Sequence, residues 1–177
     1  MEFVKLTCEQ RQAFADDGFL VVRNALDADR VTQLTEDCDG LAGAFLHKPE
    51  ISGKPEYNHL DLRRGLLKEQ SLLALVANST TVPLVIQLLS PNIHLHSTTV
   101  IYKRPENHDD PPFRRGWHRD IRIPKDLGHE QLPLVGIKVC YCLTDFQQPN
   151  SGMTLMARGS HRLFGPLTLP KGDVDPA

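Results

Sequence analysis

The sequence predicts one domain that is mainly β with flanking helices, folded as a double-stranded β-helix (jelly roll). A length of 177 residues suits a single domain with its own core. Residues 1–92 show helical patterns and one strand pattern, whereas residues 93–177 are rich in the Thr, Val, Ile and Tyr runs typical of strands. A helical layer followed by strands with long Pro- and Gly-bearing loops suits a jelly roll with helices outside one sheet.

The first helix has clear start and stop signals. Thr7 followed three residues later by Gln10 makes a capping box for a helix over residues 8–17. Gly18 is suited to end that helix in the left-handed conformation. The segment Phe19 to Arg23 then predicts a strand.

A second helix is expected after Asp27, which can act as its N-cap. Its apolar residues recur at helical spacing and predict packing on a sheet: Val31, Leu34 and Leu41. The rest of the first half divides into a loop over 47–57, a helix over 66–76 and a helix from Thr81 that stops at 90–92. Residues 93–104 and 134–146 are the expected strands of the second half.

Composition excludes several classes of partner. A formal net charge of −2 gives no electrostatic case for a nucleic acid or an anionic membrane. No apolar run approaches the roughly 20 residues that span a bilayer, so no membrane span is expected. The four cysteines form no C-x-x-C pair and predict reduced thiols, which favours the cytoplasm. The oligomeric state is not predicted.

The motif that carries chemistry is Trp117-His118-Arg119-Asp120. Residues two apart on a strand point to the same side, so His118 and Asp120 can present an imidazole and a carboxylate to one ion. They are two of the three ligands of a 2-His-1-carboxylate triad, which leaves Fe(II) open positions for a 2-oxo acid and O2. Because about 0.6 H-x-D matches arise by chance in such a chain, a solvated strand-end pair is the alternative.

Further segments resemble the phytanoyl-CoA dioxygenase family in order and spacing. They are the sequences at 17–22, 98–105, 139–145, 150–154 and 159–162. The resemblance covers nearly the whole chain. It implies a cupin-like jelly roll that uses Fe(II), 2-oxoglutarate and O2 to hydroxylate a C–H bond of a small organic or lipid-like molecule.

The resemblance also implies roles for individual residues. His118 and Asp120 would be the iron ligands, and Tyr141 would be the aromatic residue beside 2-oxoglutarate. Val100 and Tyr102 would line the same pocket from the preceding strand. A carboxylate at position 120 argues against the related halogenases, which have a small residue there.

One part of the family pattern is missing. A second His ligand and a later Arg that pairs with 2-oxoglutarate would follow the Gly159-Ser160-His161 turn, and neither appears before Ala177. His161 belongs to the turn motif and is not taken as the missing ligand. The expectation is therefore a truncated or fragmentary form, and the rival function is a catalytically silent jelly-roll binding module.

Three other groups have both a functional and a structural interpretation. His94 and His96 share a strand face, where a structural role is favoured over a 2-oxoglutarate-independent cupin site that uses His96. His59 and Asp61 repeat the H-x-D pattern at the end of a polar loop, outside a strand. A basic cluster surrounds the motif and suits either an anionic small-molecule substrate or a solvated loop: Arg114, Arg115, Arg119, Arg122 and Lys125.

Overall fold

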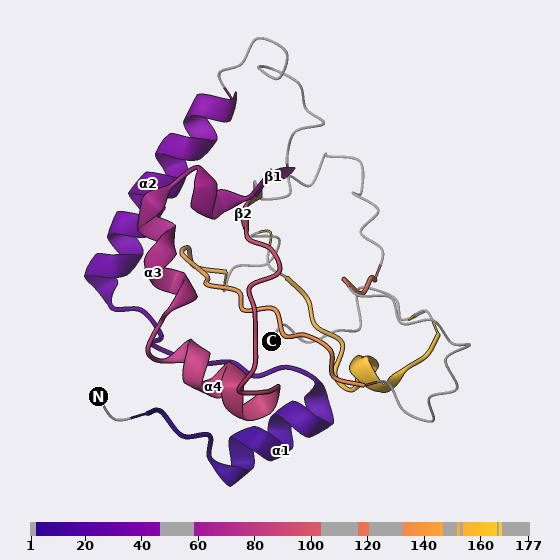
Figure 1. Cartoon of the computed structure of the whole chain (residues 1–177). Coiled ribbons are helices and arrows are strands. Elements are labelled where there is room, and N and C mark those ends of the chain that lie inside the picture. The colour runs from indigo at the N-terminus through magenta and orange to yellow at the C-terminus, as the bar shows by residue number, and fades with distance from the viewer. Residues whose placement is uncertain are drawn as a thin grey trace.

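The computed structural model describes residues 3–46, 59–103, 117–120, 133–146, 152, 154–165 and 167. The predicted loop at 47–57 and most of the basic cluster lie outside these residues. In chain order the elements are α1 (Cys8–Asp17), α2 (Ala28–Leu46), β1 (His59–Arg63), η2 (Gly65–Leu67), η3 (Gln70–Leu72), α3 (Leu73–Val76), α4 (Thr81–Leu88), β2 (Thr99–Lys103) and η5 (Ser160–Arg162) (Figure 1).

The ends of α1 are those that the sequence predicts. Thr7 Oγ1 accepts a hydrogen bond from the Gln10 amide at 3.1 Å, and Gln10 Oε1 accepts one from the Thr7 amide at 3.0 Å. Gly18 ends the helix with φ 85°, and its amide donates to the Phe14 carbonyl at 3.0 Å. Each bond satisfies a backbone group that a helix end would otherwise leave unpaired. The capping box and the glycine stop are confirmed.

α2 supplies the helical side of the core. Asp27 Oδ1 accepts a hydrogen bond from the Arg30 amide at 2.7 Å, which confirms the predicted N-cap. Leu34, Cys38 and Ala42 are buried at spacings of four residues and therefore form one face. This face packs on η3 and on both strands, as the sequence predicts for a helix lying on a sheet.

The described sheet has two antiparallel strands, β1 and β2, next to the upper end of α2 in Figure 1. Leu60 pairs with Tyr102 and Leu62 with Val100. Leu60 and Leu62 are buried against Ala42, so this face of the sheet meets the helix. Asp61, Arg63 and the odd-numbered residues of β2 point the other way.

β1 was not predicted, and the placement of His59 and Asp61 outside a strand is wrong. The alternation of Leu60 and Leu62 with polar residues is the signal of a half-buried strand. It is short, and the pairing that makes it a strand comes from β2, about 40 residues further along the chain.

Other elements differ from the expectation. Phe19 to Arg23 forms no strand, and the helix expected over 66–76 is divided into η2, η3 and α3. β2 takes up only the end of the strand predicted over 93–104, and residues 134–146 have no strand ladder with another described segment. A strand needs a hydrogen-bonded neighbour, which composition alone does not supply.

The fold class is therefore only partly visible. Helices exceed strands among the described residues, so the mainly β expectation does not hold for this part of the chain, and one strand pair does not make a jelly roll. The jelly roll itself stays a prediction at this point. The strand pair nevertheless joins the two predicted halves of the domain, because β1 lies within residues 1–92 and β2 within residues 93–177.

Within the described residues no single helix is long and apolar enough to cross a membrane. The helical segments Gln70–Val76 and Thr81–Leu88 reach the required length and composition only together, and they are bent by 45°. Leu72 and Leu84 of this pair are buried inside the protein.

Candidate metal site

His118 and Asp120 face each other in a short described segment, 117–120. His118 Nε2 lies 3.5 Å from Asp120 Oδ1, and the two side chains are 79% and 48% exposed. Two ligands about 2.1 Å from an ion and at right angles to each other lie about 3 Å apart. The pair is therefore close to the spacing of two adjacent ligands, and solvent can reach it.

Lys138 holds the other oxygen of the same carboxylate. Its ammonium is ion-paired with Asp120 Oδ2, which leaves Oδ1 directed at the imidazole. Metal-binding carboxylates are commonly fixed by such an outer partner. We find here a site residue that the sequence interpretation missed. The available signal was that Lys138 is the one charged residue in the run from Leu134 to Leu143.

The electrostatics of Cys140 show which charges gather on this side of the segment. Desolvation is the main cause that raises the pKa of the Cys140 thiol above its ordinary value. Lys138 and Lys103 act in the opposite direction, and Asp120 adds to the rise. Lys138, Lys103 and Asp120 therefore all lie within electrostatic reach of Cys140, and of the two lysines Lys138 is the one ion-paired with Asp120.

The donor set suits a divalent transition metal, because an imidazole nitrogen and a carboxylate oxygen are two thirds of a facial triad. Among the described residues no group of three or more His, Cys, Asp and Glu side chains is placed to hold a metal. The described part of the chain thus offers His118 and Asp120 as two candidate ligands.

The three residues expected beside 2-oxoglutarate contact the helices. Val100 packs against both core clusters, and the Tyr102 hydroxyl donates a hydrogen bond to Asp39 of α2. The Tyr141 hydroxyl lies 2.5 Å from Thr81 Oγ1 and donates to the Leu75 carbonyl at 3.1 Å. The described contacts of these residues involve the helical layer, so their part in cosubstrate binding stays a prediction.

The remaining candidates lie apart from this pair. His94 and His96 are exposed in the segment before β2. Because the described residues contain no three-membered ligand cluster, a cupin site built on His96 has no support from this part of the structure. Asp61 is on the sheet face away from Leu60 and Leu62. Arg119, of the predicted basic cluster, donates a hydrogen bond to the Ser160 carbonyl at 2.8 Å.

A histidine and an aspartate two residues apart, with donor atoms 3.5 Å from each other, define a candidate mononuclear metal site. The family model described as Phytanoyl-CoA dioxygenase (PhyH) matches residues 14–174. The chain belongs to this family, as its motifs predict, and the cupin-like jelly roll is the family's fold.

Among curated proteins the chain is similar to an ectoine dioxygenase of Nocardia farcinica (strain IFM 10152). The two are 26% identical over 167 residues, an alignment that covers 89% of this chain and 52% of the relative. The chain thus spans about half the length of this curated relative. No solved structure matches the chain.

Proposed function

We propose that the chain forms part of an Fe(II)- and 2-oxoglutarate-dependent dioxygenase. The reaction would hydroxylate a C–H bond of a small organic or lipid-like substrate and convert 2-oxoglutarate and O2 to succinate and CO2. The observation that supports it best is the approach of His118 Nε2 to Asp120 Oδ1 at 3.5 Å in a chain of this family. Both the metal and the cosubstrate are part of the proposal.

Each residue of the pair has a distinct task in this proposal. His118 would bind the metal through Nε2, and Asp120 would bind it through Oδ1. When bound, Fe(II) with 2-oxoglutarate supplies the oxidising chemistry, and the protein supplies the orientation. Lys138 keeps Oδ2 occupied, which favours one-oxygen coordination by the carboxylate and leaves more of the metal open to other ligands.

The cosubstrate pocket is proposed beside the His118–Asp120 pair. The family resemblance assigns Val100, Tyr102 and Tyr141 to it, and Lys138, which is ion-paired with Asp120, would add positive charge that favours an anionic molecule there. An anionic substrate would benefit from the same field. The relative is named an ectoine dioxygenase, which concerns that protein. For this chain the proposed substrate is a small organic or lipid-like molecule.

A second candidate is a binding module of the same fold without catalysis. It is favoured by the presence of two ligands, rather than three, among the described residues. Such a module would bind an organic acid near the lysines without oxidising it.

The two candidates differ in turnover of 2-oxoglutarate. The protein, expressed with its full coding sequence, would be incubated with Fe(II), 2-oxoglutarate and O2, and succinate would be quantified. The oxygenase should release succinate, and His118→Ala and Asp120→Ala should each abolish that release. Binding of 2-oxoglutarate with no succinate from the wild-type protein would favour the silent module and contradict the oxygenase.

A further inference from the structure

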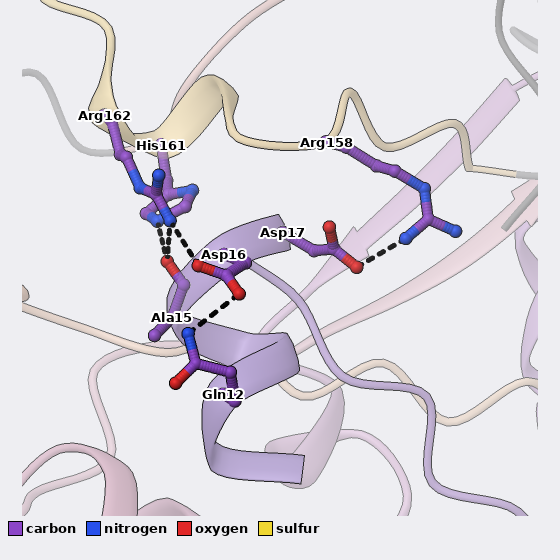
Figure 2. A network of polar contacts seen from close by, with 7 residues as sticks. All are labelled: Gln12, Ala15, Asp16, Asp17, Arg158, His161 and Arg162. Carbon is purple, nitrogen blue, oxygen red and sulfur yellow. Dashed lines mark hydrogen bonds and ion pairs between the residues drawn. The ribbon is translucent and has the colours of Figure 1, made fainter. Parts of the chain in front are cut away.

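A turn near the end of the described chain is fastened to the C-terminal end of α1 (Figure 2). We call residues 158–162 the clamp turn. The Gly159 amide donates to the Asp17 carbonyl at 2.9 Å, and Arg162 donates to the Ala15 carbonyl at 2.5 Å. These bonds satisfy carbonyls that the end of a helix leaves unpaired. The two segments that they join are more than 140 residues apart in sequence.

Charged contacts add to these backbone bonds. Arg158 is ion-paired with Asp17 and lies over the Phe19 ring, 5.5 Å from its centroid. Arg162 is 3.0 Å from Asp16 Oδ1. The hydrogen bond from Gln12 is the main cause that lowers the pKa of the Asp16 carboxyl below its ordinary value, and the hydrogen bond from Arg162 is the next. The clamp turn is therefore fixed to α1 at several independent points.

The fit between the two segments depends on Gly18. A Cβ at this position would lie 2.3 Å from His161 Nδ1, and the backbone has φ 85°, which side-chain-bearing residues rarely adopt. His161 Nε2 lies 3.2 Å from the Ala15 carbonyl oxygen. A side chain at position 18 would therefore displace the clamp turn as well as strain the helix end.

The clamp turn also contacts the candidate metal site. Arg119, between the two proposed ligands, donates its 2.8 Å hydrogen bond to the carbonyl of Ser160. Arg119 is thus bonded to the clamp turn, while the side chains on either side of it, His118 and Asp120, face each other. This bond would restrict movement of the segment, and such movement would change the distance between the two proposed ligands.

We propose that Arg119 is a positioning residue, which ties the His118–Asp120 pair to the clamp turn and through it to α1. The metal part of this inference rests on the proposed function, whereas the tether itself does not. Removing an outer-shell partner of metal ligands typically weakens metal binding by about 10- to 100-fold. Because Arg119 is exposed, we expect a loss near the lower end, about tenfold, for Arg119→Ala.

The tether can be tested without metal, because Trp117 is the single Trp of the chain and lies two residues from Arg119. Acrylamide quenching of its fluorescence reports on the exposure of this segment. Arg119→Ala and Gly18→Ala should both increase quenching, and Arg119→Lys should restore much of the protection. Arg23→Ala, an exposed arginine, and Gly40→Ala, where a Cβ meets nothing within 4 Å, are the matched controls and should leave quenching unchanged.

The effect on metal affinity is measured by anaerobic titration of the same variants with Co(II) or Fe(II). Far-UV circular dichroism establishes that each variant is folded. The proposal requires folded Arg119→Ala to bind metal about tenfold more weakly than wild type and Arg119→Lys to recover part of the loss. Equal affinity of Arg119→Ala and wild type overturns it. If wild-type protein shows no His118-dependent binding, the proposed function fails, and unchanged Trp117 quenching in Arg119→Ala would then overturn the tether as well.

Discussion

The ammonium of Lys138 is ion-paired with Oδ2 of Asp120, while the other oxygen of that carboxylate faces His118. One carboxylate oxygen is therefore occupied by a protein cation, and the other is free to bind the proposed metal. It gives Lys138 a role in orienting a ligand.

We predict that Lys138→Met weakens Fe(II) binding by about tenfold, the smaller end of the range for outer-shell partners, since the pair is partly exposed. Isothermal titration calorimetry under argon measures the affinity for Fe(II). Lys138→Arg keeps the charge, so its affinity should remain close to that of wild type. Tighter metal binding by Lys138→Met would contradict this role and would mean that the ammonium competes with the metal.

The Tyr102 hydroxyl should lose its proton at a higher pH than an ordinary tyrosine because of its hydrogen bond to Asp39. The hydrogen bond to the Asp39 carboxylate is the main cause that raises the pKa of Tyr102 to about 12, compared with about 10 for an ordinary tyrosine. The raised folded-state pKa means that the interaction stabilises the fold below about pH 10 and that this contribution is lost as the pH rises to about 12.

Asp39→Asn should therefore lower the pKa of Tyr102 toward its ordinary value. Absorbance at 295 nm during alkaline titration measures the phenolate, and Tyr102→Phe identifies which part of the signal belongs to this residue. An identical Tyr102 titration in wild type and Asp39→Asn would show that the hydrogen bond does not control it.

Tyr141 joins the segment 133–146 to the helices through its hydroxyl. Tyr141→Phe removes a donor to the Leu75 carbonyl and leaves Thr81 Oγ1 without this contact. We expect the free energy of unfolding to fall by about 1 kcal/mol, the usual net value of one such hydrogen bond. Urea denaturation measures the change.

The same variant also tests the proposed pocket. If the Tyr141 ring lies beside 2-oxoglutarate, Tyr141→Leu should weaken cosubstrate binding more than Tyr141→Phe does, because only the former removes the aromatic ring. Equal cosubstrate affinities in the two variants would leave Tyr141 with its structural role alone.

The sequence predicted best what is decided locally. The capping box of α1, its stop at Gly18 and the Asp27 cap involve groups within a few residues of one another. β1 could not be predicted with the same ease, because Leu60 and Leu62 acquire their strand only through Val100 and Tyr102. The segment 133–146 has strand composition, but the identity of its neighbours is a property of the whole fold.

The same distinction applies to the site. The spacing of His118 and Asp120 is visible in the chain, and the structure brings their donor atoms to 3.5 Å. Lys138 and Ser160 reach the motif from 18 and 41 residues away, and no local pattern indicates those contacts. The inward or outward direction of Val100 and Tyr102 likewise depends on which sheet face α2 covers.

The central claim is that His118 and Asp120 form an iron site which accepts 2-oxoglutarate. Its most direct test is an anaerobic titration of this chain with Fe(II) and then 2-oxoglutarate, monitored by the visible metal-to-ligand charge-transfer band of the chelate. We predict a band in wild-type protein that is lost in His118→Ala and in Asp120→Ala, with Arg23→Ala unchanged. A band of equal strength in either ligand variant, or none in wild type, would contradict the claim.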